Sequence, residues 1–564
     1  MKHLTLQRRI CKVLAVVLTS GAFAAPPTTA RDMMIATANP AATEAGLSVL
    51  QNGGSALDAA IAAQMVLNIV EPQSSGIGGG AFLLYWDAKS KTLHSYDGRE
   101  TTPAAADEDL FVANGEKMKW RNALVGGRAV GAPGLLAMLQ TAHDKHGQLP
   151  WAELFTPAID IAEKGFLVSP RLSQSIASEA KKGGLGRYTT ARDYFFTAEG
   201  DALPPGTLLK NPALAQTFRT VAKDGARAFY TGDIARDIVS AVRDVKDNPG
   251  VLDETDLQNY RAKERPPLCA DYRQYKVCGM GPPTSGGMTL IQILKILESF
   301  DMAAVEPLSA QAAHLFSQAA RLAYADRAAH MADSDFYPVP TDKLLDEKYL
   351  AARAKLINPD KDMGRAESGL PRPAGQNHAL PSTTHLSVVD RHGNALSMTS
   401  SIENAFGSTL MTRGFLLNNQ LTDFSFAAED KDGVKIANRV QPGKRPRSSM
   451  SPTIVFDSDG APLLIIGSPG GSRIINYVAR AVVAVLDWNM EIQNALDLPH
   501  YVNRNGMTEL EADTAAENLR AELEDMGHQI KTRPLVSGLH AVHITGGVLH
   551  GGADYRREGT AAGE

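Results

Sequence analysis

In the first half of the chain, apolar residues recur at helical spacing. The stretch PAATEAGLSVLQNGG (40–54) predicts a helix that ends at Asn52-Gly53, because this pair readily adopts the left-handed conformation that closes a helix. Ser55 predicts the N-cap of a second helix running to about Val70, with Asp58 three residues on as its capping-box partner. Residues 130–350 continue this mostly helical pattern, interrupted by Gly and Pro.

After Thr383 the apolar pattern changes to short alternating runs separated by turns. Four strands are predicted in THLSVVD (384–390), NALSMTSSI (394–402), SPTIVFD (451–457) and PLLIIGS (462–468). A helix follows in RIINYVARAVVAVLDW (473–488), and LHAVHITGGVLHGGAD (539–554) predicts a last strand pair. Strands with helices around them indicate a layered α/β fold.

Two glycine-rich stretches resemble nucleotide-binding turns only superficially. SSGIGGGAFLLYWD (74–87) follows a helix and opens a strand, whereas a dinucleotide fingerprint follows a strand and opens a helix. PPTSGGMTLIQILKILESF (282–300) contains no GK[ST], so it is not a phosphate-binding P-loop. Neither stretch therefore predicts a nucleotide site.

The first 24 residues are typical of a secretory signal peptide. Lys2, Arg8 and Arg9 precede an apolar run (10–24), and Ala22-Phe23-Ala24 fits a cleavage site. A membrane anchor is the alternative, but the run is shorter than the ~20 residues that span a bilayer. We expect a soluble mature protein that is periplasmic or secreted.

Composition and charge argue against a nucleic-acid-binding function. The chain is 44% hydrophobic and 21% charged, with a net charge of -5, and its Lys and Arg are scattered, so we expect no nucleic-acid partner.

Cys269 and Cys278 flank a predicted hairpin whose two-residue turn is Arg273-Gln274, which places the thiols opposite each other. Either a disulfide or two free buried thiols would fit this register.

The candidate chemistry lies where the loop-like stretch 357–382 meets the strand at Thr383. His385 is a poor base for Thr383, because residues two apart on a strand lie ~7 Å apart. A packed histidine is the simpler interpretation. Cleavage before Thr383 would instead free an α-amine with a pKa near ~7.7–8.0 beside its own hydroxyl. Such an amine can act as the base for the threonine hydroxyl.

Two further features fit a threonine nucleophile. If residues 390–394 form the hairpin loop, Ser401 lies opposite Thr383, although a slip of one residue would destroy this pairing. Gly470 and Gly471 form a tight turn before a helix, where adjacent N–H groups suit a developing oxyanion. An ordinary glycine turn is the alternative.

Seven motifs in order resemble the γ-glutamyltranspeptidases over nearly the whole mature chain. They are SVLQNGGSALDAAIAA, SSGIGGGAF, YDGRETTPAAA, TTHLSVVD, LLNNQLTDFS, KRPRSSMSPT and SPGGSR. The resemblance implies a four-layer αββα N-terminal-nucleophile hydrolase whose precursor cuts itself between Ser382 and Thr383. The expected products are a large subunit (25–382) and a small subunit (383–564) that stay together as a heterodimer.

The resemblance also implies a role for individual residues. Thr383 matches the nucleophile, Ser401 the hydroxyl beside it, and Gly470 and Gly471 the oxyanion glycines. The donor-binding residues implied are Arg99, Ser448 and Ser449 for the α-carboxylate, and Asp423 with Gln420 for the α-ammonium. The residue types suit this task, because a guanidinium fork binds carboxylate and a carboxylate accepts from ammonium. The implied partners are glutathione or other γ-glutamyl donors, with water, amino acids or peptides as acceptors. No metal or organic cofactor is expected.

Two departures from the family pattern affect specificity. Ser401-Ile402-Glu403 stands where the family commonly has Thr-x-Asn, and Glu403 would add a negative charge that strengthens ammonium binding. The segment 424–447 lacks the tyrosine of many bacterial lids, which predicts a more open pocket. Cephalosporin acylases, which cleave glutaryl groups on the same scaffold, are the alternative function, and a catalytically inactive solute-binding protein is a third.

Overall fold

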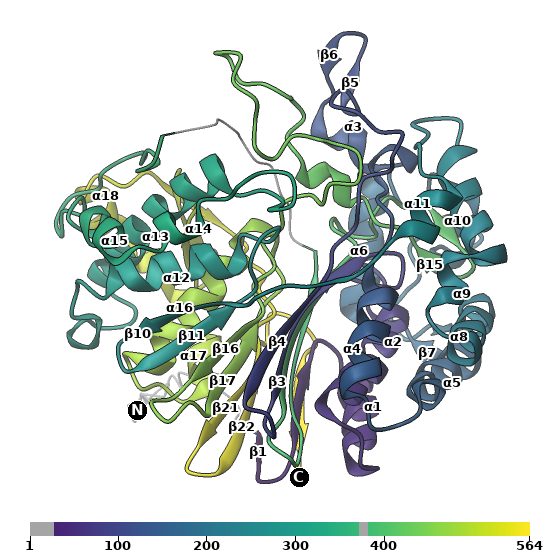
Figure 1. Cartoon of the computed structure of the whole chain (residues 1–564), viewed down its shortest axis with the longest axis horizontal. Coiled ribbons are helices and arrows are strands. Elements are labelled where there is room, and N and C mark those ends of the chain that lie inside the picture. The colour runs from purple at the N-terminus through teal and green to yellow at the C-terminus, as the bar shows by residue number, and fades with distance from the viewer. Residues whose placement is uncertain (1–27, 372–381) are drawn as a thin grey trace, which may run out of the picture.

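The protein is a sandwich of two antiparallel sheets between two helical layers (Figure 1). The computed structural model describes residues 28–371 and 382–564, so the predicted signal peptide lies outside the described residues. One seven-stranded sheet has the order β1 (Thr28–Ala30), β22 (Val548–Ala553), β21 (His540–Thr545), β17 (Pro462–Gly467), β16 (Thr453–Phe456), β11 (Tyr275–Gly279) and β10 (Leu268–Tyr272). The other has the order β23 (Thr560–Gly563), β2 (Met34–Thr37), β12 (Thr384–Val389), β13 (Ala395–Ser401), β3 (Gly80–Asp87), β4 (Thr92–Gly98) and β9 (Lys263–Glu264).

Three apolar layers hold the sandwich together. Between the sheets lie side chains such as Met34, Trp86, Val389, Phe456 and Ile465. One outer layer of helices covers the sheet that contains β12; it includes α1 (Pro40–Gln51), α2 (Ala56–Val70), α4 (Leu135–His146), α5 (Thr156–Lys164), α8 (Pro212–Asp224) and α10 (Gly232–Arg243). The other layer includes α12 (Gly286–Leu297), α13 (Ala310–His330), α16 (Ile474–Leu486) and α17 (Ile492–Asp497). This is the predicted αββα arrangement.

Smaller elements connect and cover these layers. The remaining helices are α3 (Trp120–Leu124), α6 (Pro170–Lys181), α7 (Thr189–Phe195), α9 (Arg227–Tyr230), α11 (Glu254–Asn259), α14 (Thr341–Leu344), α15 (Glu347–Ala354) and α18 (Arg520–Asp525). The remaining strands are β5 (Val112–Ala113), β6 (Glu116–Lys117), β7 (Phe166–Leu167), β8 (Leu208–Leu209), β14 (Met411–Thr412), β15 (Phe415–Leu416), β18 (Tyr501–Asn503), β19 (Thr508–Glu511) and β20 (Ile530–Arg533). Among the described residues, no helix is both long enough and apolar enough to cross a bilayer.

The local sequence signals act as predicted. Asn52 follows the end of α1, and Ser55 and Asp58 form the capping box of α2. In the β10–β11 hairpin, Tyr272 pairs with Tyr275 around the predicted two-residue turn. The same register pairs Cys269 with Cys278, and a disulfide joins the two thiols.

The segments before and after Thr383 are interleaved in both sheets. β12 and β13, which follow Thr383, lie between β2 and β3, which precede it. In the other sheet β16, from the later segment, pairs with β11, from the earlier one. A cut before Thr383 would therefore leave two pieces joined by the backbone hydrogen bonds of two sheets.

Candidate active site

Thr383 is buried at the start of β12, beside the hydroxyl that the hairpin register predicts. Val389 pairs with Ala395 across the loop 390–394, and Thr384 pairs with Ser400. The next position brings Thr383 opposite Ser401, and the Thr383 hydroxyl donates to Ser401 Oγ over 3.3 Å. The same hydroxyl contacts the carbonyl oxygen of Ser382. The threonine oxygen thus lies against the peptide bond whose cleavage the sequence predicts.

His385 is a packed histidine, as predicted, and not a base for Thr383. Its ring is fully buried, and its two nitrogens contact the hydroxyls of Thr399 (2.9 Å) and Ser387 (3.1 Å). Burial, followed by the neighbouring His540, holds the pKa of His385 well below its ordinary value. The ring is therefore neutral at physiological pH.

The turn at Gly470 and Gly471 lies at the end of β17, three residues after Gly467. A side chain at Gly467 would collide with the ring of His385, so this strand end packs closely against the start of β12. Gly470 and Gly471 have φ values of 137° and 60°, which glycine adopts more readily than other residues. No described residue accepts a hydrogen bond from either N–H. The turn therefore presents two backbone donors near the end of the sandwich that carries Thr383.

Arg99 and Asp423 form a buried ion pair. The Arg99 side chain follows β4 and is fully buried, and its Nη2 lies 2.5 Å from Asp423 Oδ2. Arg99 also donates to the carbonyl oxygens of Pro446 (3.1 Å) and Arg447 (3.2 Å). These bonds fix the guanidinium against the backbone immediately before Ser448, so the predicted carboxylate-binding and ammonium-binding residues meet at one point.

Ser448 and Ser449 lie in the same buried region, and an arginine that the sequence did not reveal holds one of them. Ser448 Oγ accepts from the Met450 N–H (3.1 Å), whereas Ser449 Oγ accepts from Arg327 Nη2 (2.6 Å). Arg327 comes from the last turn of α13 and is itself almost fully buried. The Ser449 hydroxyl is therefore oriented by a buried cation.

The side chain of Arg447 closes the C-terminal end of α13. Its Nη1 donates to the carbonyl oxygens of Arg327 (2.9 Å) and Met331 (3.3 Å). A cation at this position complements the negative end of the helix dipole, and it adds a side-chain donor to the Arg327 carbonyl, which also accepts from the Met331 N–H. Arg447 thus fixes the helix end from which Arg327 reaches Ser449.

Glu403 lies in a strained backbone conformation next to the residues that are predicted to bind the ammonium. Its φ is 79°, a region that asparagine tolerates and glutamate rarely adopts. Gln420 Nε2 donates to Glu403 Oε2 over 3.2 Å, and the Glu403 N–H donates to Ser401 Oγ over 2.8 Å. Burial, followed by the charge of Asp423, raises the pKa of Glu403 well above its ordinary value. Burial and the neighbouring Asp423 thus both favour the protonated form of Glu403.

Glu100 is a second buried acid that sequence reasoning missed. It follows Arg99, is fully buried, and its Oε2 lies 3.7 Å from Arg99 Nη1. Neither of its carboxylate oxygens has a hydrogen-bond partner among the described residues. Burial raises its pKa to about 8, against the opposing effect of Arg99. The only sequence signal for Glu100 is its position beside Arg99 in YDGRETTPAAA.

The tyrosine-free segment 424–447 is anchored to an earlier part of the chain. Phe426 stacks on Phe111 with ring centroids 4.1 Å apart. Glu108 accepts from Arg439 Nε (2.8 Å) and Lys435 Nζ (2.6 Å). The segment is therefore held by aromatic and ionic contacts although it lacks the tyrosine.

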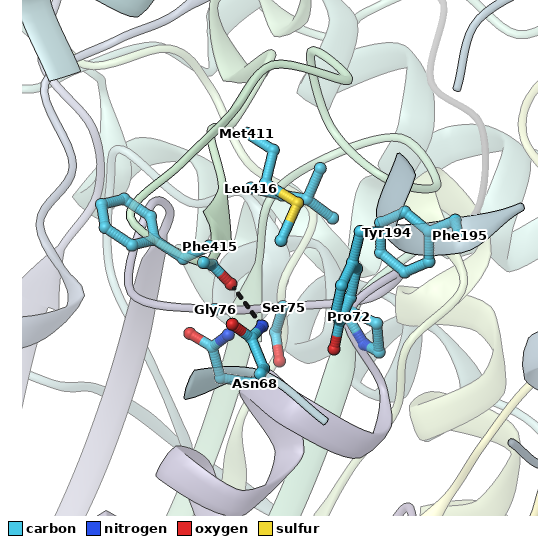
Figure 2. A pocket seen from close by; sticks show the side chains of 11 residues that line it. Asn68, Pro72, Ser75, Gly76, Tyr194, Phe195, Met411, Phe415 and Leu416 are labelled. Carbon is cyan, nitrogen blue, oxygen red and sulfur yellow. Dashed lines mark hydrogen bonds between the residues drawn. The ribbon is translucent and has the colours of Figure 1, made fainter. Parts of the chain in front are cut away.

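The β14–β15 hairpin packs over the turn that precedes β3. Figure 2 shows Met411 and Leu416 facing Tyr194 and Phe195 across a small cavity. The Asn211 side chain donates to the Gly414 carbonyl over 2.8 Å and secures the hairpin tip. The cavity measures about 10 Å³, which is the space of one water molecule. It is therefore a packing feature and cannot hold a substrate.

Comparisons with known proteins agree on one family. The family model described as gamma-glutamyltranspeptidase matches residues 42–564. The chain is 37% identical over 551 residues to a glutathione hydrolase proenzyme of Bacillus subtilis, covering 94% of this chain and 92% of that protein. It is 33% identical to the acylase ACY 1 proenzyme of a Pseudomonas species, with 95% and 94% coverage.

A solved structure supports the fold independently. The crystal structure of a cephalosporin acylase from Bacillus halodurans superposes with a TM-score of 0.85 at 26% sequence identity. The match covers 97% of this chain and 99% of that one. With the αββα sandwich and the buried threonine at a strand start, these matches show that the chain is an enzyme of the gamma-glutamyltranspeptidase family, with the N-terminal-nucleophile hydrolase fold.

Proposed function

We propose that this protein is an exported γ-glutamyltransferase and glutathione hydrolase that activates itself by cleavage between Ser382 and Thr383. The Thr383 hydroxyl attacks the Ser382 carbonyl carbon, so that an ester replaces the peptide bond and the Thr383 amine is freed. Water then hydrolyses the ester, which leaves a carboxylate on Ser382 and a free hydroxyl on Thr383. The contact between the Thr383 hydroxyl and the Ser382 carbonyl supports this step.

The mature enzyme then transfers a γ-glutamyl group through Thr383. The α-amine of Thr383 takes the hydroxyl proton as Oγ attacks the γ-amide carbonyl, and it returns this proton to the leaving amine. The N–H groups of Gly470 and Gly471 stabilise the oxyanion. Water, an amino acid or a peptide finally attacks the γ-glutamyl ester and regenerates the free threonine.

The Arg99–Asp423 ion pair is the observation that carries this assignment. A γ-glutamyl end group has a carboxylate and an ammonium on one carbon. It can therefore replace the existing ion pair by two new ones, its carboxylate on Arg99 and its ammonium on Asp423. A glutaryl group has only the carboxylate, so its binding to Arg99 would leave the largely buried Asp423, whose side chain is 12% exposed, without a cation, which is unfavourable.

Cephalosporin acylase activity remains the second candidate function. The acylase names of a Pseudomonas relative and of the Bacillus halodurans structure favour it. Asp423 opposes it for the reason just given. The two functions share the nucleophile and differ in whether the ammonium-binding residues contribute to donor binding.

Initial rates on γ-glutamyl-p-nitroanilide and glutaryl-p-nitroanilide separate the two functions. We expect purified, self-cleaved protein to prefer the γ-glutamyl anilide by at least about tenfold in kcat/KM, since one well-placed buried ion pair contributes more than about 1.4 kcal/mol. Thr383→Ala is the control for background hydrolysis. Equal or faster cleavage of the glutaryl anilide would assign the acylase function instead.

Two substitutions at Glu403 separate its effect on donor binding from its effect on the backbone. Glu403→Gln keeps the strained φ but removes the carboxyl that can ionise against the ammonium, so we expect KM for the γ-glutamyl anilide to rise about threefold or more. Glu403→Asn should raise KM similarly and also stabilise the fold by about 1 kcal/mol relative to Glu403→Gln, because asparagine tolerates a positive φ.

The measurements for Glu403 are KM by initial rates and the free energy of unfolding by urea titration of the uncleaved Thr383→Ala background. An unchanged KM in both variants would show that Glu403 does not contact the donor. Equal stability of the Asn and Gln variants would show that the backbone at position 403 carries no cost for glutamate.

A further inference from the structure

Arg557 places a buried cation directly on the nucleophilic residue. It lies in the connection between β22 and β23, and its side chain is 8% exposed. Its Nη1 donates to the carbonyl oxygen of Thr383 over 2.9 Å, and its Nε donates to the carbonyl oxygen of Ser537 over 2.9 Å. The two bonds fix the guanidinium in one orientation beside Thr383.

This contact brings the Arg557 charge close to the α-amine that cleavage would free. The amine nitrogen and the carbonyl oxygen of one residue are at most about 4 Å apart by covalent geometry. The Thr383 amine therefore lies within about 7 Å of Arg557 Nη1. Burial, followed by the charge of Arg171, lowers the pKa of Arg557 to about 9, so Arg557 is still a cation at neutral pH. A cation at this distance disfavours protonation of the amine.

Other charges around Arg557 are mostly engaged elsewhere. Glu71, at the end of α2, accepts from Arg171 Nε of α6 over 3.1 Å, and Asp554 accepts from Arg556 and from backbone N–H groups. The ionisable groups that face this region from the packed elements are Glu71, Arg171, His385, Tyr477, His540, Asp554, Arg556 and Glu558. Burial lowers the pKa of His540 to about 3, and His385 is likewise neutral. Arg557 is the cation that touches Thr383 itself.

We propose that Arg557 keeps the α-amine of Thr383 unprotonated at neutral pH through its positive charge, and so prepares the general base of the reaction. This inference rests on the proposed function, in which that amine takes the proton of the Thr383 hydroxyl. An amine with the ordinary pKa of ~7.7–8.0 would be mostly protonated at pH 7 and unable to accept a proton. Arg557 does not touch the donor in this role; it acts through the nucleophilic residue and is a tuning and positioning residue.

The pH dependence of kcat/KM tests this role, because its acid limb reports the pKa of the base in the free enzyme. In Arg557→Gln the neutral amide can still donate to the Thr383 carbonyl, but the charge is gone. We expect the midpoint of the acid limb on γ-glutamyl-p-nitroanilide to move up by about one pH unit. Activity should fall several-fold at pH 7 and return to within about twofold of the wild-type enzyme on the alkaline plateau.

Two further variants make the test decisive. Arg557→Lys keeps the charge, and its acid limb should stay within about 0.3 pH units of the wild-type limb. Glu71→Gln removes a nearby negative charge, so its limb should move down, opposite to Arg557→Gln. If Arg557→Gln does not self-cleave, the pH profiles of kcat/KM for Arg557→Lys and Glu71→Gln test the role of Arg557. The proposal would be overturned if the acid limb of Glu71→Gln has the wild-type midpoint. It would also be overturned if Arg557→Gln lowers kcat/KM by the same factor at every pH.

The same assay separates this inference from the proposed function. Wild-type protein without turnover of the γ-glutamyl anilide would count against the proposed function. The wild-type protein could instead turn over the anilide while the acid limb keeps its midpoint when the charge at position 557 or 71 changes. That result would support the proposed function and contradict the role of Arg557.

Discussion

Thr383→Ala should remain a single chain and lose at least about 10⁴-fold in kcat/KM, because one hydroxyl is required for both self-cleavage and transfer. Intact-mass measurement should show the uncleaved polypeptide, whereas the wild-type protein should yield a fragment that begins at Thr383. Thr383→Ser keeps a hydroxyl in nearly the same place, so it should still cleave and turn over, although more slowly.

The adjacent threonine provides a matched control for this experiment. Thr384 is equally buried, but its hydroxyl has no hydrogen-bond partner among the described residues, and Thr384 pairs with Ser400 in the hairpin. Thr384→Ala should therefore cleave and retain activity within about threefold. A Thr384→Ala chain that stays intact, or a wild-type fragment that begins at residue 384, would show that Thr384 is the nucleophile and that Thr383 is not.

The placement of Ser401 beside Thr383 could be predicted from the sequence because a hairpin fixes its own register. The polar loop 390–394 sets which residues pair, and the alternating strands on either side keep the pairing in phase. The Cys269–Cys278 pairing follows from the same kind of local reasoning. Helix caps at Ser55 and Asn52 were likewise readable, since capping involves residues only a few positions apart.

The contacts that determine the chemistry of the site could not be read in this way. Arg327 meets Ser449 across 122 positions, and Arg557 meets Thr383 across 174. No periodicity or turn signal connects residues so far apart: Arg327 lies in the last turn of α13, and Arg557 lies in the turn between β22 and β23. Sequence reasoning selected Arg99 and Asp423 as site residues but did not predict the ion pair between them.

Glu403 shows a second limit of sequence reasoning. From the sequence it adds a negative charge next to Asp423. Burial with Asp423 as its neighbour raises its pKa well above the ordinary value and so opposes that charge. The charge state of a buried group depends on its surroundings in the fold, and residue type alone does not determine it.

Asp423→Asn should reverse the donor preference of the enzyme. An amide at this position cannot balance the donor ammonium, and losing one partner of a buried ion pair costs about 2–5 kcal/mol. We therefore expect kcat/KM for γ-glutamyl-p-nitroanilide to fall by about 10²-fold or more. The same change frees Arg99 from its ion pair, so a donor that carries only a carboxylate should bind better, and the rate on glutaryl-p-nitroanilide should be unchanged or higher.

Asp432→Asn is the matched control for Asp423→Asn, because Asp432 is an exposed acid in the adjacent segment 424–447. It should alter neither rate by more than about twofold. The decisive quantity is the ratio of kcat/KM for the two anilides, since a general loss of folding or self-cleavage lowers both values and leaves their ratio intact. A parallel loss on both donors in Asp423→Asn protein that is folded and fully self-cleaved would mean that Asp423 acts by holding Arg99 in place, and that the donor ammonium is bound elsewhere.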